Sequence, residues 1–219
     1  TLDDVANNWT QVFDPDDAAF SGPGTPLESD RVKRSLTTAI DWVTTGTCDR
    51  AYMTIANDDT GTEGGVFYSD AAAKLVSFAE TYNIPVAETI AGRGVMLHDH
   101  PQNVGPLGVI GSSSANLLAA EADVVLAIGT RLQDFTTGSW SVFGNQHMRL
   151  ISINAARYDA HKHRALSIVG DALVGIEELG QALNDWKGPE VWASQANSLY
   201  SEWNRTVDEH SGPTDVVPP

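Results

Sequence analysis

Basic residues are scarce in this chain of 219 residues, which has 13 lysines and arginines against 29 aspartates and glutamates and a formal net charge of −16. Such a surface repels the phosphates of nucleic acids and anionic membranes, so we expect neither as a partner. The acidic residues are spread along the chain, and 42% hydrophobic residues are too many for a disordered polypeptide. We expect the solvated surface of a salt-adapted protein, with an ordinary acidic cytosolic protein as the alternative.

Cysteine is nearly absent as well. Cys48, the only one, excludes an internal disulfide and a cysteine zinc site. The sequence has no run of about 18 apolar residues that would span a membrane. It also shows no leader in which charged residues precede apolar ones. These features favour the cytoplasm. Because the chain starts at Thr1 and stops at Pro219, we expect an excised or processed segment of a longer protein.

Several catalytic motifs are missing too. The chain has neither a Gly-x-Ser-x-Gly nucleophile elbow nor a phosphate-binding Gly-x-x-x-x-Gly-Lys loop. His98 and His100 are close in sequence but have no third ligand at metal-site spacing, and the same holds for His161 and His163. No metal site is therefore expected. The sequence indicates a scaffold with ligand contacts and no self-contained catalytic machinery.

Glycine and proline clusters divide the chain into three zones. Residues 1–30 are polar and rich in Asp, Gly and Pro, and are expected to be an interdomain linker. Residues 31–185 carry the periodic patterns of a folded domain. Residues 186–219 are expected to form a helix over about 190–208 and then a linker toward a missing C-terminal domain.

Strand-like and helical patterns alternate within residues 31–185. Strands are expected at 51–56, 84–90, 123–129, 149–154 and 165–169, and a loop at 91–111. Helices are expected at about 32–43, from Ser69 or Asp70 to Tyr82, at 113–121 and from Asp171 to about Leu183. Apolar strands that alternate with helices predict an α/β fold, a doubly wound, Rossmann-like parallel sheet of the type that binds NAD or FAD. Its ligand site would lie beyond the carboxyl ends of the strands.

A glycine run is the first candidate for such a site. Gly105, Gly108 and Gly111 are spaced three apart just before a helix, and glycine lets a backbone approach a phosphate. A helix N-terminus adds free N–H groups and a positive dipole end, and Ser112 would either cap the helix or touch the phosphate. The run is not Gly-x-Gly-x-x-Gly and follows a loop. Tight packing of that loop is an equally good interpretation.

Four further residues lie at the ends of strands or in loops. Arg93 and Arg131 would each pair with a phosphate or, equally, with one of the many carboxylates. Asn154 ends a strand where a ribose-binding acid often lies, and the alternative is that it caps the next turn. Asp171 would meet a ribose or adenine edge, but the interpretation as a helix N-cap is slightly favoured.

Several short runs carry a family resemblance. They occur in the order of the central domain of thiamine-diphosphate-dependent enzymes such as acetolactate synthase: Gly64–Ala71, Ile84–Thr89, Ala91–Gly94, Asp99–Pro101, Gly105–Gly111, Ala122–Val125 and Gly129–Arg131. The chain resembles this family over about residues 30–185. The longer run Gly129–Trp140 is similar to a narrower branch, the trihydroxycyclohexane-1,2-dione hydrolases of myo-inositol catabolism.

This resemblance implies a non-catalytic domain of a larger enzyme. In the family, an N-terminal domain supplies the glutamate that activates thiamine, and a C-terminal domain holds the diphosphate through Mg²⁺. The parent enzyme would open the cyclic dione by C–C cleavage to 5-deoxy-glucuronate. Its partners would be the catalytic domains of the same polypeptide, in a homodimer or homotetramer. Some relatives bind FAD or ADP in the central domain, and by position those contacts would fall on Arg93, Gly108, Gly111, Ser112, Arg131, Asn154 and Asp171.

Two departures from the family pattern weaken the expectation of a nucleotide. Residues Asn57–Glu63 intervene between the first strand and its Gly-Gly turn, and Asn154 replaces the usual acid. A structural, interdomain role is therefore expected. The alternatives are a free-standing or vestigial FAD- or ADP-binding module and an acetolactate-synthase-like central domain. An NAD-dependent deacylase shares the fold class but would need zinc-binding cysteines and a catalytic histidine loop.

Overall fold

The computed structural model describes residues 38–44, 48–55, 65–66 and 69–211. The expected linker at 1–30, the insertion at 57–63 and the end of the chain after residue 211 lie outside the described residues. Within them, residues 38–44 are helical, inside the helix expected at 32–43 and one residue beyond it.

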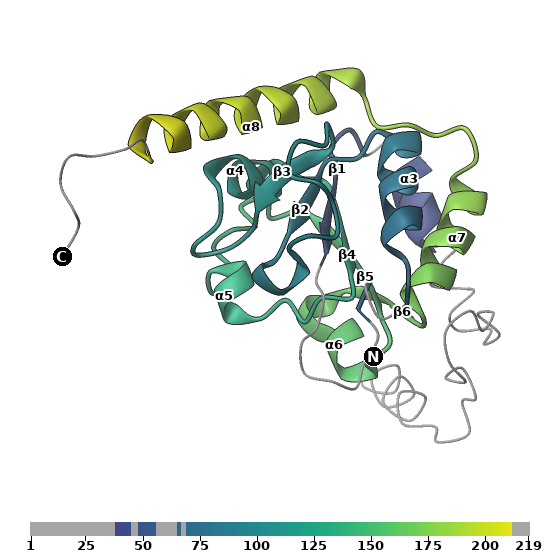
Figure 1. Ribbon diagram of the computed structural model, residues 1–219. Helices are drawn as coiled ribbons and strands as arrows, with labels where there is room; N and C mark the ends of the chain where they lie inside the picture. The colour runs from purple at the N-terminus through teal and green to yellow at the C-terminus, as the bar shows by residue number, and fades with distance from the viewer. Residues whose placement is uncertain (1–37, 45–47, 56–64, 67–68, 212–219) are drawn as a thin grey trace.

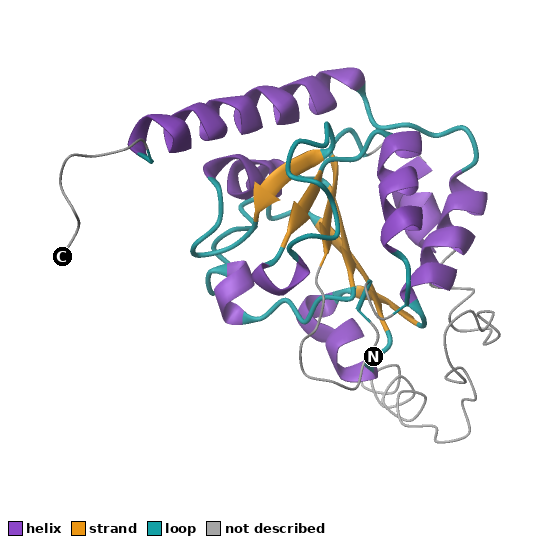
Figure 2. Cartoon of the chain, viewed as in Figure 1, coloured by secondary structure: helices purple, strands orange, loops and turns teal. Residues whose placement is uncertain are grey.

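Six parallel strands form one sheet in the order β3-β2-β1-β4-β5-β6, as predicted for a doubly wound α/β fold (Figure 2). Every residue of β1 and β4, the two central strands, is buried, which is why β4 is a continuous apolar run in the sequence and β1 is apolar except for Thr54. The strand order reverses between these two strands, and doubly wound sheets bind ligands at such a point. The strands are β1 Ala51–Ile55, β2 Val86–Glu88, β3 Asn103–Pro106, β4 Val124–Ile128, β5 Arg149–Asn154 and β6 Leu166–Val169.

Helices cover both faces of the sheet (Figure 1). Helices α3 (Ala72–Tyr82) and α7 (Ala172–Leu183) pack together on one face, and α4 (Ser113–Glu121) and α8 (Glu190–His210) pack on the other. Shorter elements follow the strands at their carboxyl ends: α5 (Asp134–Thr137) after β4, α6 (Arg157–Ala160) after β5, and the 3-10 turn η1 (Ile90–Gly92) after β2. A second 3-10 turn, η2 (Lys162–Arg164), comes between α6 and β6.

The start of α8 is anchored in the core. Trp192 is 2% exposed, and its indole N–H donates to the carbonyl of Ala51 over 2.9 Å. Ala196 is buried one turn later, whereas most residues from 201 onward are exposed. None of the described helices combines the length and the apolar character needed to cross a bilayer.

The structure corrects three local expectations. Helix α3 begins after Ala71, not after Ser69 or Asp70, and no side chain caps it. Strand β2 ends at Glu88, because the chain turns into η1. The expected loop at 91–111 contains β3, so the glycine run continues from a strand and Gly105 lies within it. By contrast, α4 and α7 begin and end where the sequence predicts.

Candidate functional site

All seven candidate residues lie at the carboxyl edge of the sheet, but the structure separates them. Gly108, Gly111 and Ser112 follow β3 at one end of the sheet. Arg131 and Asn154 lie beside each other at the ends of β4 and β5. The remaining two stand apart: Arg93 is exposed after η1, and Asp171 precedes α7.

The glycine turn is packed against its own chain. The Gly108 N–H donates to Asn116 Oδ1 (3.0 Å), and the Gly108 carbonyl accepts from Asn116 Nδ2 (2.9 Å). The Gly111 N–H donates to the Gly108 carbonyl over 2.9 Å. A Cβ atom on Gly108 would lie 2.5 Å from the Phe135 carbonyl oxygen, and one on Gly111 would lie 2.5 Å from the Pro106 oxygen. These contacts fit the packing interpretation of the glycines.

Ser112 is fully buried and caps α4. Its Oγ accepts a hydrogen bond from the Ala115 N–H over 3.1 Å. The same hydroxyl has two carbonyl acceptors at hydrogen-bonding distance, Val104 at 3.1 Å and Pro106 at 3.2 Å. Its own N–H donates to the Pro106 carbonyl over 2.7 Å. The backbone N–H groups of Gly108, Gly111 and Ser112 are therefore all used within the protein.

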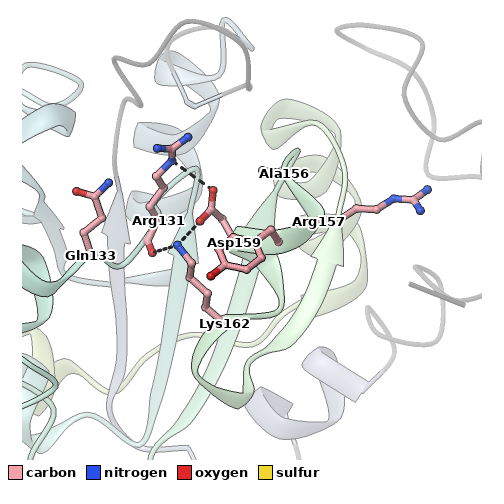
Figure 3. A pocket seen from close by; sticks show the side chains of 7 residues that line it. Arg131, Gln133, Ala156, Arg157, Asp159 and Lys162 are labelled. Atoms are coloured by element: carbon pink, nitrogen blue, oxygen red, sulfur yellow. Dashed lines mark hydrogen bonds and ion pairs between the residues drawn. The ribbon is translucent and has the colours of Figure 1, made fainter. Parts of the chain in front are cut away.

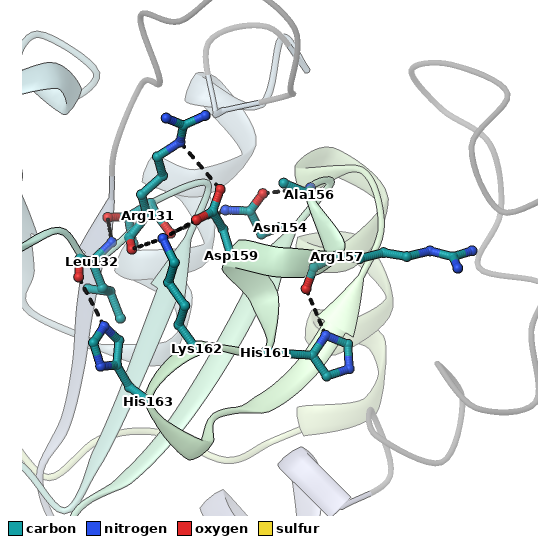
Figure 4. Close-up of polar contacts among 10 residues, drawn as sticks. Arg131, Leu132, Asn154, Ala156, Arg157, Asp159, His161, Lys162 and His163 are labelled. Carbon is teal, nitrogen blue, oxygen red and sulfur yellow. Dashed lines mark hydrogen bonds and ion pairs between the residues drawn. The ribbon is translucent and has the colours of Figure 1, made fainter. Parts of the chain in front are cut away.

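A pocket of about 330 Å³ lies beyond the carboxyl ends of β4 and β5 (Figure 3). Its one buried charge is Asp159, which is 7% exposed. Arg131 Nε lies 3.3 Å from Asp159 Oδ2, while Lys162 pairs with Asp159 Oδ1 and donates to the Arg131 carbonyl over 3.4 Å. Arg157 also lines the pocket, but its guanidinium points away from the other charges (Figure 4), so two cations and one carboxylate meet here and leave a positive region in an acidic protein. The lining residues are Arg131, Gln133, Ala156, Arg157, Tyr158, Asp159 and Lys162.

Asn154 is buried beside the pocket, and its side-chain amide bonds to the backbone of the protein. Its Nδ2 donates to the Thr130 carbonyl (3.2 Å), and its Oδ1 accepts from the Ala156 N–H (2.8 Å; Figure 4). Both ends of the amide thus tie the loop after β4 to the loop after β5. Asp171 caps α7 by accepting from the Val174 N–H over 3.2 Å, the interpretation that the sequence slightly favoured.

A clasp of strained residues holds the loop after β4. His163 Nε2 lies 3.1 Å from the Leu132 carbonyl oxygen, and its ring stacks on Trp140 with centroids 4.2 Å apart. Leu132, Trp140 and His163 all have positive φ, at 46°, 70° and 56°. Left-handed backbone in non-glycine residues costs energy, so it persists only where surrounding contacts enforce it.

Sequence reasoning missed most of the pocket. Gln133, Tyr158, Asp159 and Lys162 were not among the candidates, and His161 and His163 were considered only as metal ligands. The available signal was the density of basic residues between Arg157 and Arg164, in a chain with 13 basic residues in total.

The described residues do not assemble a metal centre of their own. Among them, no three His, Cys, Asp or Glu side chains converge closely enough to hold an ion.

Comparison with known proteins identifies the relatives of this domain. A family model described as "Thiamine pyrophosphate enzyme, central domain" matches residues 62–179. A 3D-(3,5/4)-trihydroxycyclohexane-1,2-dione hydrolase of Geobacillus thermodenitrificans is 39% identical over 145 residues, which cover 66% of this chain and 22% of that protein. Enzymes of the same name from Clostridium perfringens and Bacillus thuringiensis are 47% and 46% identical over 116 and 120 residues, covering 53% of this chain and 18% and 19% of theirs. The chain thus spans about a fifth of the length of these relatives.

Proposed function

Because this chain belongs to the central-domain family of thiamine pyrophosphate enzymes, we propose that it is the central domain of a trihydroxycyclohexane-1,2-dione hydrolase. The parent enzyme opens the cyclic dione by C–C cleavage to 5-deoxy-glucuronate. Thiamine diphosphate and Mg²⁺ are held by other domains of the same polypeptide, and the parent assembles as a homodimer or homotetramer in the cytoplasm. The identity of 46–47% to hydrolases of that name supports this specificity over acetolactate synthesis.

One observation in particular supports a structural role for this domain. The N–H groups of Gly108, Gly111 and Ser112, which would cradle a phosphate, are already donated to Asn116, Gly108 and Pro106. A phosphate at this turn would have to break these bonds. The carboxyl edge is therefore suited to holding loops in place for neighbouring domains.

The test is an assay of the parent polypeptide. Purified parent is incubated with the dione, thiamine diphosphate and Mg²⁺, and 5-deoxy-glucuronate is measured by mass spectrometry. Product should form only when thiamine diphosphate is present, and the 219-residue chain alone should form none. Condensation of pyruvate to acetolactate without turnover of the dione would reject the proposed substrate in favour of the acetolactate-synthase alternative.

The pocket beside Arg131 supports a second candidate, a site for FAD or ADP. Its positive charge favours an anionic ligand, but both Arg131 and Lys162 are paired with Asp159. Calorimetric titration of this chain with ADP, FAD and NAD at high salt separates the candidates. Micromolar binding that Arg131→Ala abolishes would establish a nucleotide site, and flat titrations are expected for the structural role.

A further inference from the structure

Exposed apolar side chains gather at the carboxyl edge of the sheet. In the part of the chain that the structure describes, nine large apolar side chains are exposed, and six of them follow the carboxyl ends of strands: Ile90, Leu97, Val109, Ile110, Phe135 and Tyr158. Val109, Ile110 and Phe135, here called the apolar face, are 61%, 62% and 65% exposed. Grouped apolar exposure of this kind marks an interaction surface.

The apolar face is built on two loops that are fixed to each other. The Val109 N–H donates to the Phe135 carbonyl over 2.9 Å, which joins the loop after β3 to α5. Asn116 of α4 holds Gly108 through both its N–H and its carbonyl. These bonds leave the loops little freedom to turn the three side chains inward.

The loop after β2, which carries the exposed Ile90 and Leu97, is also fixed in place. The buried carboxylate of Glu88 accepts from the N–H groups of Gly94 and Met96, at 3.1 and 3.0 Å. Asn103 Nδ2 donates to the Leu97 carbonyl over 3.1 Å. The Leu107 N–H donates to the Glu88 carbonyl over 2.9 Å and so connects this loop to the one after β3.

We propose that the apolar face is buried against another domain of the same polypeptide. The matched region is 18–22% of the curated relatives, so about four-fifths of their length lies outside it and supplies further domains. Exposed Gln133 and Asp134 lie next to Phe135 in the sequence, so we expect an apolar contact at the centre of the interface with polar groups at its rim. This proposal rests on the proposed function in one respect only, namely that the parent polypeptide contains a neighbouring domain.

Hydroxyl-radical footprinting of the parent tests the assignment without any substrate. Oxidation of Phe135 and Ile110 should fall about five-fold or more in the parent relative to this chain alone, because the centre of an interface excludes water. Val191, which is 79% exposed in α8, is the matched control and should react equally in both. Should the isolated chain fail to fold, Phe135 and Val191 are compared within the parent, where Phe135 must be the protected residue.

Because the readout is solvent protection, it stays valid if the parent proves to act on another substrate. Phe135→Ser should lower the melting temperature of the parent but not of this chain, and Val191→Ser should lower neither. Equal oxidation of Phe135 in the parent and in this chain would overturn the proposal. So would a dimer of this chain in analytical ultracentrifugation that Phe135→Ser dissociates, because the occupant would then be a second copy.

Discussion

Replacement of Gly108 by alanine distinguishes a packing role of the glycine turn from a phosphate-binding role. Gly108 has a φ of 119°, and its added Cβ would lie 2.5 Å from a backbone oxygen of Phe135. Alanine at this position is therefore unfavourable for two reasons, the positive φ and the close approach of its Cβ to the Phe135 oxygen. A disallowed φ costs about 1–3 kcal/mol, and forcing an extra methyl into a packed site costs about the same again. Together they predict a loss of about 2–6 kcal/mol in the free energy of unfolding.

Two other glycines separate these contributions. Gly94 has a φ of 92° but no atom within 4 Å of an added Cβ, so Gly94→Ala reports the backbone conformation alone. Gly111 has no positive φ, but its Cβ would lie 2.5 and 2.6 Å from backbone atoms of Pro106 and Gly108, so Gly111→Ala reports the contact alone. We expect each to lose about 1–3 kcal/mol and Gly108→Ala to lose more than either.

Urea unfolding followed by circular dichroism measures all three variants, with thermal melting as a second probe. In a domain of this size about 1 kcal/mol corresponds to a shift of about 2–4 °C in melting temperature. The packing argument is refuted if Gly108→Ala unfolds at the same urea concentration as the wild type. If that variant is instead fully stable but loses affinity for ADP or FAD, the glycine serves a phosphate.

Three further predictions concern the core and the pocket. Burial, and secondly the charge of Asp123, raise the pKa of the Cys48 thiol to about 12. The unfolded chain releases this proton above about pH 9 while the native chain keeps it, so stability should fall between pH 9 and 12 by at most about 1.4 kcal/mol per pH unit. The free energies of unfolding of the wild type and of Cys48→Ala are measured in urea at several pH values in this range. Their difference should show that slope, and a difference that does not change with pH would contradict it. Trp192→Ala should cost about 3–5 kcal/mol by the same urea assay and Val207→Ala under about 0.5, and equal losses would contradict the anchoring of α8. Asn154→Asp should cost about 1–3 kcal/mol, because a carboxylate oxygen would replace the donor to the Thr130 carbonyl. A stability gain in that variant would show that the amide is not needed there.

The sequence predicts most of the sheet and misses its edge for a physical reason. Strand β4 and helices α4 and α7 carry local signals: a continuous apolar run in the strand, and N-caps at Ser112 and Asp171 in the helices. Strand β3 is only Asn-Val-Gly-Pro, which has low strand propensity. Its extended form depends on pairing with β2 at the edge of the sheet, where a proline is tolerated.

The site was harder to predict because its contacts join distant residues. The need for glycine at position 108 comes from the Phe135 carbonyl, 27 residues later, and no local pattern encodes that approach. Likewise, Arg131 meets Asp159 only because β4 and β5 are neighbours in the sheet. The fold class predicts that the seven candidate residues lie at the carboxyl edge of the sheet. It does not predict whether each of them contacts a ligand or bonds to another residue of the same chain.

The strained clasp and the apolar face share the segment that follows β4. A loop that carries Leu132 and Trp140 at positive φ would relax in isolation, so the contacts of His163 hold it away from its preferred conformation. Phe135 lies between these two residues in the sequence, within α5. Burial of Leu132, which is 4% exposed and packs in the core, offsets part of this strain, whereas Phe135 is 65% exposed among the described residues and gains little there. The footprint of Phe135 in the parent therefore tests whether this exposed apolar side chain is buried by a neighbouring domain.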